Sequence, residues 1–204
     1  MGVKYWIGFN IVPSIGPAKV RALLDHFGDL ESAWHAESGA LKQAGMDRRA
    51  IESLVKLRTQ LDLDAEMEKL ARHDVTALTW EDDAYPSLLK QIYAPPPVLY
   101  VRGSLSPDDE WAVGVVGTRR ATNYGKQVAR MLGGDLGRSG VTVVSGLARG
   151  IDGIAHQAAL DAGGRTIAVT ACGLDRVYPP EHRKLAQAIA EHGGEFLARG
   201  GRAI

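Results

Sequence analysis

The chain has very little cysteine and no long hydrophobic run. Cys172 is the single cysteine among 204 residues, so neither an intrachain disulfide nor a cysteine-based zinc finger can form. No window approaches about 18 uninterrupted apolar residues, and the first residues lack the pattern of a signal peptide. These absences predict a protein of the reducing cytoplasm that makes no contact with a membrane.

The chain also lacks a net charge, because 24 Lys and Arg balance 24 Asp and Glu. The charges are unevenly distributed, however. Residues 1–100 carry 11 cations and 14 anions, whereas residues 111–204 carry 12 cations, ten of them Arg, and 7 anions. Arg suits bidentate contact with phosphate. Since 17 of the 24 glycines also lie in residues 111–204, the pattern favours two differently built domains.

The first domain, residues 1–74, is predicted to be a small helical domain. Its apolar residues recur at spacings of three and four, and Gly28, Gly39 and Gly45 separate the helices. Residues 13–19 place a glycine turn before a helix that carries Lys19, a pattern similar to one helix-hairpin-helix element that holds a DNA phosphate. An ordinary helix-helix turn in a small bundle is the alternative.

The second domain, residues 75–204, alternates strands and helices. Apolar runs predict strands at residues 112–117, 141–144 and 166–170, with helices between them at 124–138 and 151–162. Shorter strands are predicted at residues 75–79 and 98–103, the second after three prolines. The near-continuous run 112–117 is typical of a parallel strand covered on both faces. We therefore predict an α/β fold with a doubly wound, Rossmann-like parallel sheet.

The loops that leave the predicted strands carry the candidate site. Carboxyl ends of parallel strands share one sheet edge, so residues 117–120, 145–152 and 171–175 are expected to meet there. The first two loops combine glycine with a hydroxyl and an Arg beside a helix start. Helix amides, a hydroxyl and a guanidinium together form a cradle for an oxyanion, and two cradles suit two neighbouring phosphates.

Common enzyme motifs do not fit this edge. The first loop is neither G-x-G-x-x-G nor a P-loop, Ser145 is not in a G-x-S-x-G elbow, and the six His show no ligand spacing. Asp152 is either a general base or, more simply, a helix N-cap or an Arg partner. For Cys172 we expect a small buried residue rather than a nucleophile, and for His156 a polar-edge or packing role.

Several segments together resemble the DNA processing protein A (DprA, also called Smf) family. They are Val113–Thr122 with Tyr124-Gly125, Val143–Asp152 with Ala155-His156, Gly164–Val169, Gly173-Leu174-Asp175 with Val177–Glu181, and, earlier, Tyr85-Pro86 with Pro96–Gly103. The resemblance covers residues 75–192 tightly. It covers the N-terminal region loosely, as a SAM-like helical domain.

The resemblance implies a bacterial, cytoplasmic homodimer that binds single-stranded DNA, protects it and helps load RecA recombinase during natural transformation, without a cofactor and without catalysing a reaction. The implied DNA phosphate-binding residues are Gly117, Thr118, Arg119, Arg120, Ser145, Gly146, Ala148, Arg149, Gly150 and Asp152, with Lys126 and Gly173 as accessory candidates. Simpler interpretations exist for three of them: Arg149 pairs with Asp152, Arg120 is a solvated charge, and Gly173 shapes a turn.

Two other functions stay open at this point. A related Rossmann-like enzyme could bind or hydrolyse a nucleotide, although the edge offers only Asp152 and Asp175 as a carboxylate pair. A protein-interaction scaffold would leave the Arg-bearing loops unexplained. Residues 194–204 depart from the family's usual continuation, which makes the last strand a potential bare edge, prone to aggregation.

Overall fold

The structure is a computed structural model that describes residues 2–192 and 196–199. Contacts divide the chain into two units. The first unit holds the residues up to Arg72 together with Ala77–Leu99, and the second holds His73–Thr76 and Tyr100–Arg199. Residues 77–99 thus contact the helical part more than the sheet. The domain boundary that the sequence predicts between residues 74 and 75 stays a prediction. Among the described residues, no helix is long and apolar enough to cross a membrane.

The first unit contains the short helices that the sequence predicts up to Arg72. They are α1 (Val3–Ile11), α2 (Pro17–Phe27), α3 (Leu30–His35), α4 (Ser38–Gln43), α5 (Arg48–Arg58) and α6 (Leu63–Arg72). Asp29 and Asp47 cap α3 and α5, because each side chain accepts a hydrogen bond from a first-turn amide. Phe9, Leu23 and Leu54 are fully buried and form part of the core between these helices.

The cations at the start of α2 contact other residues of the first unit. Gly16 precedes Pro17 at the helix start, as the sequence indicates. The Lys19 ammonium donates to the carbonyl of Ser14 at 2.7 Å and forms an ion pair with Asp47. The Arg21 guanidinium lies 5.4 Å from the centre of the Trp80 ring. These contacts fit an ordinary helix-helix turn, while DNA binding by this element stays a prediction.

Along the chain, α6 is followed by β1 (Thr76–Thr79), the short helix α7 (Ser87–Lys90) and β2 (Val98–Arg102). Both strands occur where the sequence predicts them. Trp80 Nε1 and the Tyr85 hydroxyl each donate to the carbonyl of Pro96 at 2.9 Å. These two bonds hold the proline run in place directly before β2.

The second unit is the predicted α/β part, and its elements alternate along the chain. They are the 3-10 helix η1 (Pro107–Glu110), β3 (Ala112–Gly114), α8 (Asn123–Arg138), β4 (Thr142–Ser145), α9 (Ile151–Asp161), β5 (Thr166–Thr170), the 3-10 helix η2 (Pro180–His182), α10 (Arg183–Glu191) and β6 (Phe196–Arg199). Strands β3 to β6 are parallel neighbours, and the sheet order continues from β6 to β2 and β1. The predicted Rossmann-like fold class is confirmed.

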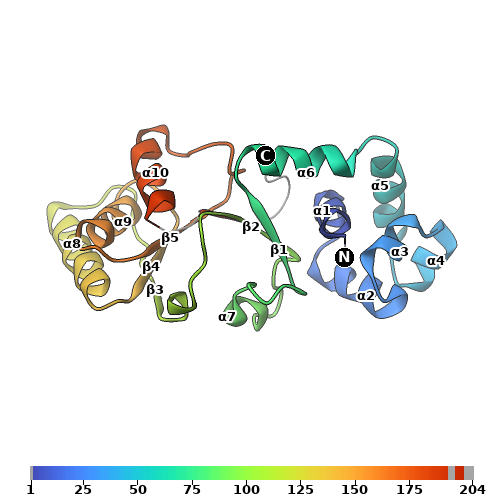
Figure 1. Cartoon of the computed structure of the whole chain (residues 1–204), viewed down its shortest axis with the longest axis horizontal. Helices are drawn as coiled ribbons and strands as arrows, with labels where there is room; N and C mark the ends of the chain where they lie inside the picture. Colours follow the sequence, from blue (N-terminus) through green and yellow to red (C-terminus); the bar gives the residue numbers. More distant parts are fainter. Residues whose placement is uncertain (1, 193–195, 200–204) are drawn as a thin grey trace. The chain divides into compact units, whose positions relative to one another are not determined.

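Helices α8, α9 and α10 lie on the same face of this sheet, because α9 contacts both of the others (Figure 1). Glycines allow α8 to lie very close to α9. A Cβ atom added at Gly133 would be 2.7 Å from the carbonyl oxygen of Ala155, and one at Gly137 would be 3.0 Å from that of Ala159. The backbones of α8 and α9 therefore approach each other directly at these two glycines.

The prediction that residues 112–117 form a strand covered on both faces is wrong. Strand β3 ends at Gly114, lies at the end of the sheet and pairs only with β4. Val113 is 42% exposed and Val116 is 76% exposed. An apolar run has the same composition in a central strand and in an edge strand, so composition could not reveal the missing neighbour. The edge strands of the sheet are β1 and β3, whereas the last strand β6 lies between β5 and β2. The chain end at residues 200–204 lies outside the described residues.

His156 packs in the core of the second unit, as predicted, and its environment makes stability depend on pH. Its Nδ1 lies 2.6 Å from Thr166 Oγ1, whose own proton goes to the carbonyl of Val143, so Nδ1 is the donor. The buried Nε2 has no hydrogen-bond partner among the described residues. Burial therefore lowers the pKa of His156 from 6.5 to about 4, with a further contribution from His182.

This lowered pKa predicts that the protein loses stability as the pH falls below 6.5. The reason is that His156 then binds a proton in the unfolded chain but stays neutral in the folded chain. The free energy of unfolding should fall by about 2 kcal/mol between pH 7 and pH 5 from this group alone. Urea denaturation at both pH values measures it. The His156→Asn variant should show a smaller difference, and an unchanged difference would contradict the assignment.

Candidate functional site

Three loops meet at the carboxyl edge of the sheet, where the parallel register places the ends of β3, β4 and β5 together. The first loop leads from β3 to α8 and ends at Thr122, whose hydroxyl accepts a hydrogen bond from the Gly125 amide at 3.2 Å. The second leads from β4 to α9 through Gly150. The third follows β5, and there the Gly173 carbonyl accepts from the Arg176 amide, so Gly173 shapes a turn.

Asp152 joins the first two loops. One carboxylate oxygen accepts the amide of Gly117 at 3.3 Å and the other accepts that of Gly146 at 3.2 Å. Asp152 is only 6% exposed, and Gly150 occupies the N-cap position of α9. The expectation of an N-cap or an Arg partner is therefore wrong, because the side chain points back to the loops instead. Two of the predicted phosphate donors, the amides of Gly117 and Gly146, are directed at this carboxylate.

Ser145 and Gly150 hold the first loop against the start of α9. The buried Ser145 hydroxyl donates to the carbonyl of Val115 at 2.5 Å. The Ile151 amide donates to the carbonyl of Thr118 at 3.3 Å. At Gly150 the backbone has a φ of 83°, and an added Cβ atom would lie 2.3 Å from the oxygen of Thr118. Only glycine permits this approach of the two loops.

The second loop is held in place by contacts with η2, one of them through Arg149. The Arg149 guanidinium forms a two-pronged ion pair with the Glu181 carboxylate, so the predicted alternative of an Arg149–Asp152 pair is wrong. Arg149 lowers the pKa of Glu181 to about 2, which keeps this carboxylate ionised throughout the physiological range. His182 Nδ1 lies 2.8 Å from the carbonyl of Leu147. The loop is thus anchored at two points by η2.

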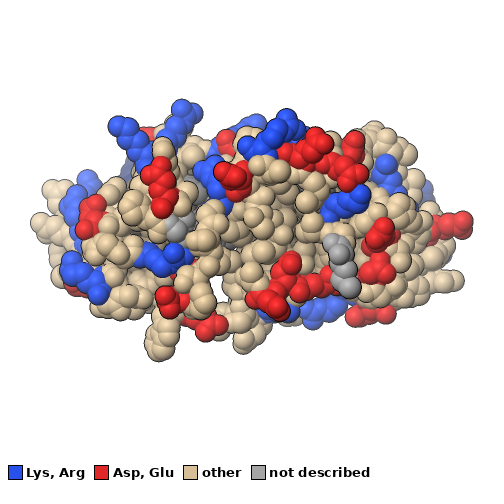
Figure 2. All heavy atoms as spheres, in the orientation of Figure 1, with Lys and Arg blue, Asp and Glu red and all other residues tan. Residues whose placement is uncertain are grey.

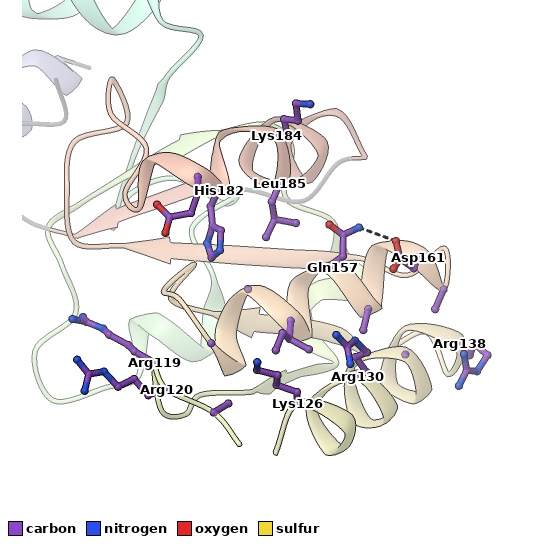
Figure 3. Close-up of a pocket in the computed structure, with 18 residues that line it drawn as sticks. Arg119, Arg120, Lys126, Arg130, Arg138, Gln157, Asp161, His182, Lys184 and Leu185 are labelled. Carbon is purple, nitrogen blue, oxygen red and sulfur yellow. Dashed lines mark hydrogen bonds between the residues drawn. The ribbon is translucent and has the colours of Figure 1, made fainter. Parts of the chain in front are cut away.

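A groove of about 790 Å³ opens beside these loops, within the second unit. Its walls come from the first loop and from α8, α9, η2 and α10, and six cations line it (Figure 3). They are Arg119, Arg120, Lys126, Arg130, Arg138 and Lys184. Figure 2 shows Lys and Arg side chains over α8 and α10 on the face in view. The two acids that line the groove are already engaged, because Glu181 pairs with Arg149 and Asp161 accepts a hydrogen bond from Gln157.

The structure divides the predicted site residues into two groups. Arg119, Arg120, Lys126 and Gly150 line the groove. The others do not line it: Gly117, Thr118, Ser145, Gly146, Ala148, Arg149, Asp152 and Gly173. Of these, Thr118 is exposed, and its hydroxyl oxygen accepts the Arg120 amide at 3.1 Å. The Ala148 carbonyl accepts the Gly153 amide.

Sequence reasoning missed four basic residues of the groove, namely Arg130, Arg138, His182 and Lys184. A signal existed for two of them. Lys126, Arg130 and Arg138 follow one another at multiples of four residues on a helix that the sequence predicts, and this spacing places them on one helix face. No comparable signal existed for His182 and Lys184, because their place depends on how η2 and α10 pack.

The remaining candidates for chemistry do not assemble into a second site. Cys172 is partly exposed rather than buried, which corrects the sequence-based expectation, and its Sγ lies 3.6 Å from the carbonyl of Arg176. Within residues 2–192 and 196–199 there is no group of three His, Cys, Asp or Glu side chains that could hold a metal ion.

The fold and the groove define a class of protein: a Rossmann-like α/β unit with a cationic groove that extends from its first loop along α8 and α9, joined to a small helical unit. The model of the family described as DNA recombination-mediator protein A matches residues 76–199. The chain belongs to this family. The resemblance to DNA processing protein A is thereby confirmed.

Relatives and solved structures agree with this assignment. Protein Smf of Synechocystis is 40% identical over 194 residues, which cover 93% of this chain and 49% of that protein. DNA processing protein DprA of Bacillus subtilis is 47% identical over 109 residues, 53% of this chain and 37% of that protein. The chain spans about half the length, or less, of these relatives.

Two solved structures are similar. The X-ray structure of DNA processing protein A from Streptococcus pneumoniae matches with a TM-score of 0.77 and 27% identity, over 98% of this chain and 70% of that one. DNA processing protein A from Helicobacter pylori, whose structure concerns its single-stranded DNA binding mode, matches with a TM-score of 0.52 and 35% identity. That match covers 61% of this chain and 54% of the Helicobacter chain.

Proposed function

We propose that this protein binds single-stranded DNA in the cationic groove and acts as a recombination mediator. The observation that carries the proposal is the set of cations beside the first loop. Arg119, Arg120, Lys126, Arg130 and Lys184 line the groove and have no ionic partner among the described residues. Unpaired cations in a concave surface attract a polyanion even though the whole chain is neutral. The single-stranded DNA binding of the Helicobacter pylori relative supports this choice of ligand.

The residues around the groove have two different tasks in this proposal. Arg119 and Arg120 contact phosphates directly, and the exposed Thr118 hydroxyl donates a further hydrogen bond, because its oxygen already accepts one. Asp152 and Ser145 contact no phosphate. They position the loops, since their polar atoms are buried and bonded to backbone groups of these loops.

The same geometry argues against the alternative function of a nucleotide-hydrolysing enzyme. Nucleotide hydrolysis would need a carboxylate that reaches a water molecule or a substrate, and Asp152 is one of the two acids proposed for it. Its two oxygens are bonded to the amides of Gly117 and Gly146, and the side chain is buried. Binding of a strand along its phosphates requires no such group.

Family membership supports the further parts of the proposal. We propose that the protein acts in the cytoplasm as a homodimer, protects single-stranded DNA from nucleases and helps RecA recombinase assemble on it. Each part has its own assay: sedimentation for the dimer, nuclease digestion of bound oligonucleotide for protection, and RecA filament assembly on precoated DNA for loading.

DNA binding itself is tested by titrating a fluorescent oligothymidine of about 20 nucleotides across a salt series. We expect affinity to fall with a slope near −0.7 per phosphate contacted when its logarithm is plotted against that of salt concentration. Single strands should bind more tightly than a duplex of equal length. Absent or salt-insensitive binding by a folded sample would overturn the proposal, and mononucleotide hydrolysis would then be assayed.

A further inference from the structure

The groove extends well beyond the loops that the proposed function uses. Figure 3 shows Arg119 and Arg120 at one end, Lys126 and Arg130 along the middle, and Arg138 at the far end. Lys126 and Arg130 stand four residues apart on α8, a separation of about 6 Å along the helix axis. Lys184 comes from α10 on the opposite wall. The cations therefore form a row rather than a single cluster.

At the far end of this row the positive charge is compensated by acidic side chains. Arg138 forms an ion pair with Asp135 at 2.5 Å, and Asp161 also lies on that part of the lining. In contrast, Lys126 and Arg130 have no ionic partner among the described residues. The uncompensated positive charge thus begins at the first loop and ends with Arg130.

Three small residues belong to the wall of the groove on the side of α9. Gly150, Gly153 and Ala158 line the groove there. A Cβ atom added at Gly153 would lie 2.5 Å from Cε1 of His182, so this ring covers the first turn of α9. The room for a ligand is the groove itself, about 790 Å³, in which a charged strand can lie beside the wall of α8.

We propose that Lys126 and Arg130 form a second phosphate-binding tract, in which α8 binds phosphates of the same DNA strand beyond those that the loops hold. Lys184 lines the same groove from α10. The proposal rests on the proposed function and adds to it a longer site, whose limit is set by the paired Arg138. It predicts that the protein contacts more nucleotides than the loops alone could reach.

The test compares two oligothymidines, of about 5 and about 20 nucleotides, with the wild-type protein and the Lys126→Gln/Arg130→Gln variant. On the longer strand the salt slope should decrease by about 1.4, and the affinity should fall about 25-fold at ~0.1 M salt, because two phosphate contacts are lost. On the shorter strand, which the loops alone can hold, the affinity should change less than about twofold.

One control variant accompanies the test. Arg48→Gln/Arg49→Gln removes the same charge from the exposed side of α5 in the first unit, outside the groove, and should bind both strands like the wild-type protein. A further variant, Arg138→Gln, tests the far limit of the tract: it removes a groove cation that is paired with Asp135, so the salt slope should decrease by less than one phosphate contact. Thermal unfolding of each variant checks that these substitutions leave the fold intact.

The outcomes separate this inference from the function on which it rests. Equal binding of the longer strand by the wild-type protein and by the variant would overturn the second tract while leaving DNA binding in place. Equal losses on both strands would also overturn it, since Lys126 and Arg130 would then belong to the same site as the loops. A wild-type protein that binds neither strand would overturn the proposed function itself.

Discussion

Replacing Arg119 with alanine is expected to weaken the binding of oligothymidine about 10-fold at ~0.1 M salt. Arg119 lines the groove, is exposed and has no ionic partner among the described residues. Loss of one phosphate contact accounts for about a fivefold effect through the released counterion, and loss of the charge-assisted hydrogen bonds adds to it. The salt slope should decrease by about 0.7.

Arg119→Lys and Arg48→Ala complete this experiment. The lysine variant keeps the charge but loses the planar fork, so its salt slope should stay near that of the wild-type protein while its affinity falls by a smaller factor. Arg48 is an exposed cation on α5, and its removal should leave affinity unchanged. If Arg119→Ala bound as tightly as Arg48→Ala, the first loop would not be the phosphate site.

Gly150→Ala is expected to have the largest effect, because it separates the two loops. The added Cβ atom would meet the carbonyl oxygen of Thr118 at 2.3 Å and the Arg119 backbone at 2.9 Å, and neither backbone group can move without displacing the loop. We expect affinity for oligothymidine to fall about 100-fold, as if the contacts of Arg119 and Arg120 were lost together. The free energy of unfolding should also decrease, because alanine is strained at a φ of 83°.

Gly163→Ala is the matched control for backbone strain. Gly163 lies in the same unit with a φ of 74°, yet an added Cβ atom would meet nothing within 4 Å. This variant should lose about 1 kcal/mol of stability while binding DNA like the wild-type protein. Urea denaturation and the oligothymidine titration, performed on both variants, separate the two effects. Similar binding by Gly150→Ala and Gly163→Ala would show that the contact between the loops is dispensable.

Much of the fold could be predicted from the sequence because its elements have strong local signals. The helix predicted at residues 124–138 is observed at Asn123–Arg138, and the strand at 166–170 is observed at Thr166–Thr170. Glycine turns, a helix N-cap and apolar runs act over a few residues, so they can be recognised without knowledge of neighbours. Whether a strand is central or at an edge is a property of its neighbours, and this is why the exposure of β3 was missed.

The position of the candidate site could be predicted from the sequence. Which of its residues line the groove and which hold the loops together could not. Sequence reasoning located the loops, and Arg119, Arg120 and Gly150 line the groove as expected of a binding site. It also grouped Asp152 with the phosphate-binding residues, whereas the structure places this carboxylate on two loop amides. Sequence spacing could not show this contact, because Gly117 and Asp152 are 35 residues apart and meet only when β3 and β4 pair.

The sequence by itself determined the order of strands and helices, the sheet edge on which the loops gather and the family to which the chain belongs. Each follows from short-range patterns and from the parallel direction of the strands. Only the tertiary structure decided which charges remain available. Arg149 and Arg138 are paired with Glu181 and Asp135, whereas Lys126 and Arg130 are not paired with any described acid. Ion pairs depend on distances of a few ångströms between packed elements, and packing alone sets those distances.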